Sequence, residues 1–340
     1  MHNITGEGGQ DLNNNEKLWE NCGLFDVIKL ADNSVILLDG GFDDQATDKA
    51  VEECMKFLRE ITGTPAGQKV RIAAMYFTHG HGDHVSFSYR LVKNHSDEIT
   101  VERLMHNLAP QNELGEEFVS LGALLKQKYP NMKFAKLHTG QCIQLANVKF
   151  EVVYTHEDMV SPEGITEIKD YNNTSTMLKM TMNGKTFLLT GDWGGGHVDR
   201  DKYEYKPMEA SIINTFKLSD GSNYLKCDVL QVSHHAINDW MSNFYTVVDP
   251  DIAFFPQQDI TYNKMAHACY KNIVNQLRTI GVTDSNMFFA GKYTYGITVA
   301  SNGTMNLSYR KIAGADDIYL SQFNKYSPFH APQSGVVPFK

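Results

Sequence analysis

Short apolar runs and amphipathic segments alternate along this chain, which is the pattern of a protein built from both strands and helices. Short runs bounded by turn-forming residues predict strands. They cover residues 25–30, 34–38, 72–77, 99–105, 133–137, 141–145, 148–154, 174–182, 186–190, 227–232, 252–255, 287–290, 296–300 and 306–309. Longer segments with apolar residues at helical spacing predict helices. They cover residues 47–62, 85–93, 112–129, 206–216 and 263–280.

The sequence between these elements contains no sign of a domain boundary. Asn183-Gly184, between two of the predicted strands, is a strong hairpin signal. No internal repeat or low-complexity linker divides the sequence. We therefore expect one domain over residues 19–312, a flexible N-terminal tail over 1–18 and a C-terminal extension over 313–340.

A stretch rich in metal-binding side chains follows the apolar run at 72–77. It reads His79-Gly80-His81-Gly82-Asp83-His84. The glycines have no Cβ and permit a tight loop, so the imidazole and carboxylate groups can converge on one point. Such donors suit zinc, manganese or iron. A solvated histidine-rich turn is the alternative, and it is disfavoured because the whole pattern follows directly on a buried strand.

The His-x-His-x-Asp-His stretch resembles the signature of the metallo-β-lactamase fold. Three further stretches, 37–41, 187–192 and 229–235, resemble other parts of that fold and come in the expected order. The resemblance covers roughly residues 20–310 and is nearest to the hydrolase domain of DNA-uptake competence proteins and to phosphorylcholine esterases. It implies an α/β fold, a four-layer αββα sandwich of two mixed sheets flanked by helices.

The same resemblance implies a site with two divalent metal ions, Zn2+ before Mn2+ or Fe. The implied ligands are His79 and His81 for one ion, Asp83, His84 and His234 for the other, and Asp192 as the bridge between them. Two ions about 3.5–4 Å apart can share a hydroxide and bind the substrate oxygens. The implied nucleophile is this metal-bound hydroxide.

The chain departs from the family pattern in one place. Members usually carry one more histidine before the strand that delivers the bridging aspartate. The matching stretch here, residues 172–175, reads Asn-Asn-Thr-Ser and has none. His156 and Asn172 are candidate replacements. An amide oxygen is a harder ligand than imidazole, so manganese becomes more plausible beside zinc.

His234 and His235 are adjacent at the end of the predicted strand at 227–232. Neighbours on a strand point to opposite faces, so we expect only one of them to bind a metal directly. We favour His234, and leave His235 as a proton donor, a substrate contact or a packing residue. Asp83 is the other candidate for proton transfer. Asp39 either orients a ligand histidine or is a simple turn residue.

The implied activity is hydrolysis, with a phosphodiester or related ester as the favoured substrate. Asp192 stands where the β-lactam hydrolysers of this family carry cysteine, which disfavours β-lactams, while lactones and thioesters stay open. An iron oxidoreductase is disfavoured because no flavodoxin-like segment follows. A non-catalytic metal sensor is disfavoured because the ligand set is nearly complete. If Trp193 and Trp240 line the pocket, they would suit a quaternary ammonium group.

Composition narrows the class of partner. The net charge is −9, from 40 acidic against 31 basic residues, which disfavours an extended nucleic-acid surface and favours a small-molecule substrate. No run approaches the roughly 18 apolar residues of a membrane helix, and no signal peptide is recognised. The five cysteines show no disulfide framework, so the cytoplasm is favoured, with a trimmed exported protein as the alternative. The oligomeric state stays open.

Overall fold

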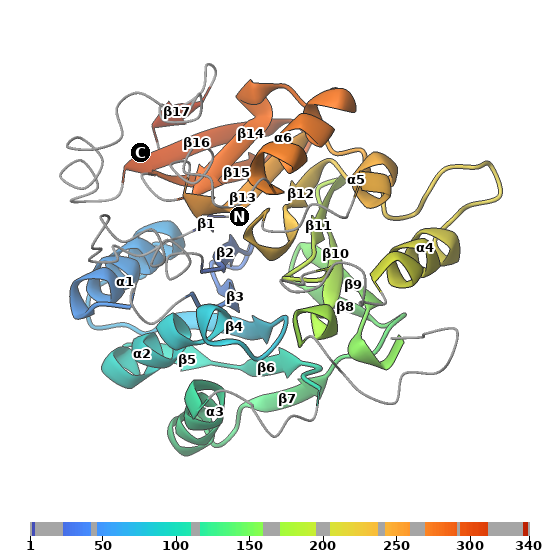
Figure 1. Cartoon of the computed structure of the whole chain (residues 1–340). Helices are drawn as coiled ribbons and strands as arrows, with labels where there is room; N and C mark the ends of the chain where they lie inside the picture. Colours follow the sequence, from blue (N-terminus) through green and yellow to red (C-terminus); the bar gives the residue numbers. More distant parts are fainter. Residues whose placement is uncertain are drawn as a thin grey trace, which may run out of the picture.

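Two sheets packed face to face form the centre of the molecule, and helices lie on the outer side of each sheet (Figure 1). The computed structural model describes residues 2–3, 23–41, 46–109, 116–158, 171–194, 205–236, 242–258, 269–290, 293–311 and 336–338. No helix within these ranges combines the length and apolar character needed to cross a membrane.

The first sheet has ten strands among the described residues, in the order β17-β16-β15-β1-β2-β3-β4-β6-β7, with β5 also paired to β4. Their bounds are β1 His2–Asn3, β2 Phe25–Lys29, β3 Val35–Asp39, β4 Val70–Phe77, β5 Ile99–Val101, β6 Arg103–His106, β7 Lys133–Lys136, β15 Tyr293–Val299, β16 Met305–Lys311 and β17 Val337–Pro338. The run from β3 to β7 is parallel, whereas β1, β2 and β3 pair antiparallel, so the sheet is mixed.

The second sheet has seven strands among the described residues, in the order β14-β13-β12-β11-β10-β9-β8. Their bounds are β8 Cys142–Leu145, β9 Val148–Tyr154, β10 Met177–Met182, β11 Lys185–Leu189, β12 Val229–Gln231, β13 Ile252–Gln258 and β14 Met287–Ala290. The strands from β8 to β11 are antiparallel and those from β11 to β14 are parallel, so this sheet is also mixed.

Six α-helices lie within the described residues. They are α1 Asp48–Thr62, α2 Ser86–His95, α3 Glu116–Lys128, α4 Tyr205–Thr215, α5 Ser242–Val248 and α6 Cys269–Thr279. The buried side chains of α1, α2 and α3 pack with those on the outer face of the first sheet. Buried side chains of α4, α5 and α6 pack in the same way on the second sheet.

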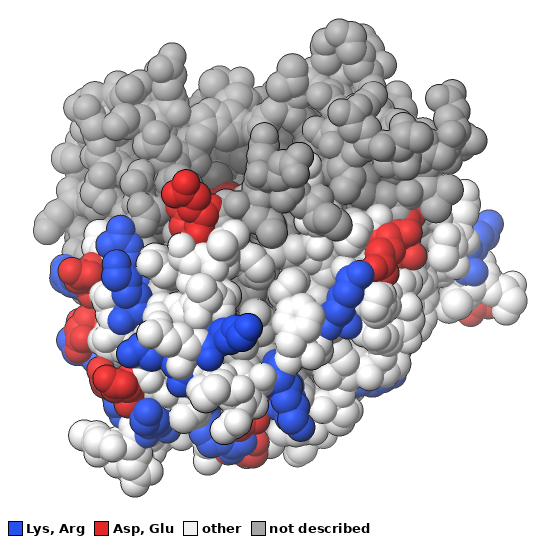
Figure 2. All heavy atoms as spheres, turned by 90° about the horizontal axis from the view of Figure 1, so that it is seen from below, with Lys and Arg blue, Asp and Glu red and all other residues white. Residues whose placement is uncertain are grey.

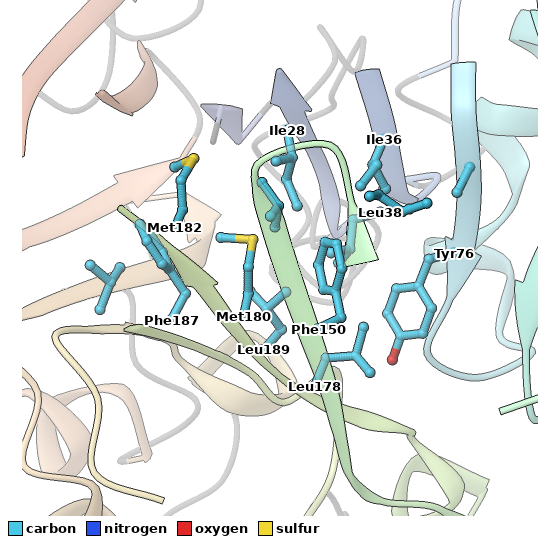
Figure 3. Packing of buried hydrophobic residues seen from close by; sticks show 14 of the residues in the cluster. Ile28, Ile36, Leu38, Tyr76, Phe150, Leu178, Met180, Met182, Phe187 and Leu189 are labelled. Atoms are coloured by element: carbon cyan, nitrogen blue, oxygen red, sulfur yellow. The ribbon is translucent and has the colours of Figure 1, made fainter. Parts of the chain in front are cut away.

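A third apolar cluster lies between the two sheets (Figure 3). Ile36 and Tyr76 of the first sheet meet Phe150 and Leu178 of the second sheet within it. Each sheet therefore buries both faces, one against helices and one against the other sheet. This confirms the predicted four-layer αββα sandwich.

Local sequence signals explain where several elements begin and end. Thr47 caps α1 by accepting a hydrogen bond from the Ala50 N–H, and Gly63 ends that helix with a φ of 65°. Asn183 and Gly184, with φ values of 50° and 78°, form the turn between β10 and β11, as their sequence predicts.

Some elements differ from the sequence prediction. The predicted strand at 99–105 is two strands, β5 and β6, which both pair with β4. The predicted strand at 174–182 begins only at Met177, because a 3₁₀ turn, η5 (Tyr171–Thr174), precedes it. Two short strands, β1 and β17, lie in segments for which we predicted no structure.

Candidate metal centre

Four strands from two sheets bring the candidate ligands to one rim. β3 ends at Asp39 and β4 ends just before the 79–84 loop, while β11 and β12 of the other sheet end just before Asp192 and His234. β3 and β4 run parallel, and so do β11 and β12, so each pair presents its carboxyl ends at the same edge of its sheet. The stretches that carry the candidate ligands therefore come together, although they lie far apart in the sequence.

Gly191 permits the close approach of these strand ends. Its φ is +56°, and a Cβ at this position would lie 2.7 Å from the Thr78 Cβ and 3.0 Å from the Ser175 Oγ. Only glycine fits such a backbone without displacing its neighbours. The next residue, Asp192, is held in place because its N–H donates to the Ser175 Oγ at 3.0 Å.

Asp83, His84, Asp192 and His235 form one compact donor group. One ligand atom from each lies within 4.8 Å of the others. The His235 Nε2 lies 3.1 Å from the Asp83 Oδ2 and 3.3 Å from the Asp192 Oδ2. The His84 Nε2 lies 3.2 Å from the Asp192 Oδ1. These separations are those of donors that share one ion, since metal–ligand bonds are about 2.0–2.2 Å long.

Further imidazoles approach Asp192 from a greater distance. The Nε2 atoms of His79 and His234 each lie 3.9 Å from the Asp192 Oδ2. The rings of His79 and His81 lie 4.6 Å apart between centroids. Asp192 is thus approached by the imidazoles of His79, His84, His234 and His235.

The two adjacent histidines lie on a tight turn and not on a strand. β12 ends at Gln231, and the 3₁₀ turn η6 (Ser233–Ala236) follows it. His234 and His235 have φ values of 47° and 50°, which is left-handed backbone. Strand alternation therefore does not apply to them. Both rings are buried and both approach Asp192, and it is His235 that joins the compact donor group.

Hydrogen bonds orient the rings toward the centre. The Asp39 Oδ2 accepts from the His84 Nδ1 at 2.8 Å and from the Thr78 Oγ1 at 2.7 Å. The Pro256 carbonyl accepts from the His235 Nδ1 at 2.8 Å. In both rings the bond at Nδ1 leaves Nε2 to face the donor group. Of the two interpretations of Asp39, the one in which it orients a histidine is therefore the one that fits.

Burial and charge oppose each other in this centre. Burial lowers the pKa of His84, but the carboxylates of Asp192, Asp39 and Asp83 outweigh it and raise this pKa to about 10. Burial raises the pKa of Asp192, yet the neighbouring imidazoles hold it well below its usual value. The pKa of His79 lies well below its usual value, because burial and the positive charge of His84 both disfavour its protonated form.

The two candidate replacement ligands lie at different places. The Asn172 Nδ2 lies 3.2 Å from the His234 Nε2, so this amide is a neighbour of His234. The His156 Nδ1 instead donates to the Asn107 carbonyl at 3.0 Å, and His156 is not part of the compact donor group.

Trp193 does not line a pocket. Its side chain is fully buried and packs between Tyr154 and Phe244, with ring centroids 5.7 and 5.4 Å away. It therefore belongs to the apolar core under α4, α5 and α6. The other predicted wall residue, Trp240, lies outside the described residues.

Sequence reasoning missed two polar residues that shape the site. Thr78 links Asp39 to the loop, because its N–H donates to the Asp39 Oδ1 at 2.7 Å. The Gln231 Oε1 accepts from the N–H groups of Thr190 and Gly191, each at 2.8 Å, and so fixes the turn before Asp192. Gln231 could have been noticed in the sequence, because it is a polar residue at the end of an otherwise apolar strand.

Comparison with known proteins gives a likeness of fold. No family model matches the chain, and no curated protein matches it. A metallo-β-lactamase from Cronobacter sakazakii is 16% identical, with 61% of this chain and 72% of that chain covered and a TM-score of 0.34. The chain is similar to proteins of the metallo-β-lactamase fold.

Two further solved structures cover more of the chain. The metallo-β-lactamase fold protein YhfI from Bacillus subtilis is 11% identical over 89% of this chain and 98% of that chain, with a TM-score of 0.44. Zn2+-bound PqqB from Methylobacterium extorquens is 11% identical over 68% of this chain and 72% of that chain, with a TM-score of 0.36. At these identities and TM-scores the likeness says nothing about activity.

Proposed function

We propose that this protein is a metal-dependent hydrolase that acts on a phosphodiester or related ester. The observation that carries the proposal is the convergence of Asp83, His84, Asp192 and His235, whose ligand atoms lie within 4.8 Å of one another although they come from three distant parts of the chain. Imidazole and carboxylate donors gathered at a buried rim are expensive to keep without an ion to neutralise them.

The donor set fits divalent cations. The Nε2 atoms of His79 and His84 are buried, and neither makes a hydrogen bond within the described residues. Asp39 and Asp192 are buried carboxylates beside them. Without an ion, the carboxylates of Asp192, Asp39 and Asp83 raise the pKa of His84 to about 10 against the effect of burial, which favours its protonated form. A bound cation would replace that proton and accept the lone pairs of the two Nε2 atoms.

The geometry supports a division of the donors into two sets. We propose that Asp83, His84 and His235 hold one ion, that His79, His81 and His234 hold the other, and that Asp192 lies between them. This assignment gives His235 the place that the sequence suggested for His234, and it moves His234 to the ion held by His79 and His81. Asn172, next to His234, is a further donor for the second set. Zn2+ remains the proposed metal, with Mn2+ or Fe as alternatives.

Divalent ions held there would supply an acidic water and positive charge for the oxygens of the substrate. The chain itself would orient the donors and move the protons. Asp83 is the proposed proton carrier, because its side chain is 21% exposed while His84 and His235 are buried. Its Oδ2 lies 3.1 Å from the His235 Nε2, so this partly exposed carboxylate stands at the donor group itself, where a proton would be taken up or released.

A phosphodiester is favoured over a β-lactam because residue 192 is aspartate, where β-lactam hydrolysers of the resembled family carry cysteine. Lactones and thioesters are weaker candidates. A small-molecule substrate suits the surface seen in Figure 2, where Lys and Arg side chains are scattered and Asp and Glu stand among them. The cytoplasm is the proposed compartment, and Cys54, Cys142 and Cys227 are free thiols.

Elemental analysis followed by a chromogenic panel tests this proposal. We expect two Zn or Mn ions per chain and turnover of bis-p-nitrophenyl phosphate before lactones or β-lactams. His81→Ala should abolish turnover, whereas His138→Ala, an exposed histidine paired with Glu157, should not. Bound iron with oxygen uptake would instead indicate an oxidoreductase. A single ion without turnover of any ester would indicate a sensor.

A further inference from the structure

Asn107 carries a buried side-chain amide that makes no hydrogen bond within the part of the chain that the structure describes. It is 1% exposed, and neither its Nδ2 nor its Oδ1 has a partner within the described residues. Burying an amide in this way costs free energy, so native proteins seldom keep one without a reason such as a bound ligand or a trapped water. The backbone carbonyl of Asn107, by contrast, accepts a hydrogen bond from the His156 Nδ1.

The strand register places Asn107 at the same sheet edge as the loop of the candidate metal centre. It follows the last residue of β6, which runs parallel to β4 with His106 opposite Phe77. Asn107 is therefore level with the beginning of the 78–84 loop on the neighbouring strand. Figure 1 shows β4 and β6 ending at the same edge.

The alternation of β6 indicates which side the Asn107 side chain takes. Met105, two residues earlier, packs in the cluster between the two sheets, whereas Leu104 packs against the helices. Residues two apart share a face of a strand. Asn107 follows the end of β6, and Leu108 after it packs on the helix side. We therefore place the Asn107 side chain on the inter-sheet side, where the His156 imidazole reaches its backbone carbonyl.

We propose that Asn107 contacts the substrate, and that the group it binds is a hydroxyl on the alcohol part of a phosphodiester. An amide offers one donor and one acceptor group, and a hydroxyl supplies the complement of both. A nonpolar ester would leave both amide atoms unpaired. The inference rests on the proposed hydrolase and narrows its substrate to phosphodiesters of polyols.

Two matched substrates test this without any variant. Glyceryl p-nitrophenyl phosphate and propyl p-nitrophenyl phosphate differ only in the hydroxyls. A neutral hydrogen bond should give the zinc-loaded protein about a tenfold preference in kcat/KM for the glyceryl ester. Asn107→Leu should abolish the preference by lowering kcat/KM for the glyceryl ester to that for the propyl ester. Equal rates for the two esters in the wild-type protein would overturn the inference while leaving the hydrolase intact.

A binding measurement separates the two proposals. Glycerol phosphate and propyl phosphate are titrated calorimetrically into the zinc-loaded protein, and glycerol phosphate should bind about tenfold tighter. If neither ester is cleaved but this difference exists and disappears in Asn107→Leu, the hydrolase fails and the contact stands. If the two bind equally, or neither binds, the contact is wrong.

Thr176→Val is the matched control. Thr176 is also buried, and its Oγ1 also has no hydrogen-bond partner within the described residues. Removing this hydroxyl should leave the hydroxyl preference unchanged. If Asn107 is only an unpaired buried amide with no role in binding, Asn107→Leu should behave like Thr176→Val. Both variants would then have a higher unfolding midpoint in urea and the same preference for the glyceryl ester as the wild-type protein. Asn107→Ala provides a second variant if the leucine does not fit.

Discussion

Asp39 gives the sharpest test of how the chain orients its donors. It ends β3 with a φ of 58° and is fully buried. Its carboxylate accepts from the Thr78 N–H, the Thr78 hydroxyl and the His84 Nδ1, at 2.7 to 2.8 Å. We expect Asp39→Asn and Asp39→Ala to differ, because asparagine tolerates left-handed backbone and retains an acceptor oxygen.

The expected magnitudes follow from these bonds. Each buried donor left unpaired costs about 1–3 kcal/mol, so Asp39→Ala, which strips the Thr78 N–H and the His84 Nδ1, should cost about 2–6 kcal/mol. Asp39→Asn should cost about half of that. Losing a group that orients a ligand histidine typically lowers metal affinity 10- to 100-fold, or about 1.4–2.7 kcal/mol. Asp39→Asn should therefore fold and bind zinc weakly.

The assay combines urea unfolding of the metal-free protein with competition for zinc against a chromogenic chelator. Asp228→Asn is the matched control, because this carboxylate also accepts from the N–H and the hydroxyl of one threonine, Thr186, both at 2.8 Å. Asp228 precedes β12, whereas His234 and His235 follow that strand. The control should lose stability without losing zinc affinity. Unchanged zinc affinity in Asp39→Asn would refute the orienting role.

The remaining predictions concern the turn, the strand ends and the histidine that ends β6. His235→Ala should reduce zinc content more than His234→Ala, as measured by elemental analysis after gel filtration, and equal losses would contradict the proposed division of donors. Gly191→Ala should lower stability by about 1–3 kcal/mol, since its Cβ would lie 2.7 Å from the Thr78 Cβ; urea unfolding measures this. Burial lowers the pKa of His106 to about 4, so the unfolded chain takes up its proton first as the pH falls. Stability present above about pH 6.5 should be lost toward pH 4, by roughly 3 kcal/mol, and His106→Gln should flatten that loss in pH-dependent unfolding.

The sequence predicted those elements whose signals are local. The helix predicted at 47–62 is α1 within one residue, because Thr47 and Gly63 cap it. The hairpin of β10 and β11 followed from Asn183-Gly184. By contrast, β1 could not be predicted, since His2–Asn3 forms a strand only through pairing with β2 and β15, which come from distant parts of the chain.

The sequence identified side chains that meet at the rim, but not how they are arranged there. The motif spacing placed His79, Asp83 and His84 on one loop, which the structure has as a loop with a short 3₁₀ turn, η3 (Gly82–His84). The roles of His234 and His235 depended on the assumption of a strand. A left-handed turn has no signature in the residues Ser-His-His-Ala, and it is stabilised by contacts with other segments, such as the His234 N–H to the Gly191 carbonyl at 3.1 Å.

The candidate centre also explains why the two sheets must keep one fixed alignment. Its donors come from both sheets, so a slide of one sheet over the other would separate Asp192 from the 79–84 loop. Two cross-sheet bonds oppose that slide: the Thr176 N–H donates to the Thr78 carbonyl at 2.9 Å, and the Tyr76 hydroxyl donates to the Thr176 carbonyl. Both lie at the end of β4, directly before the first histidine. Because a metal site tolerates errors of only about 0.5 Å, donors split between two sheets can serve one centre only where such bonds fix the sheets together.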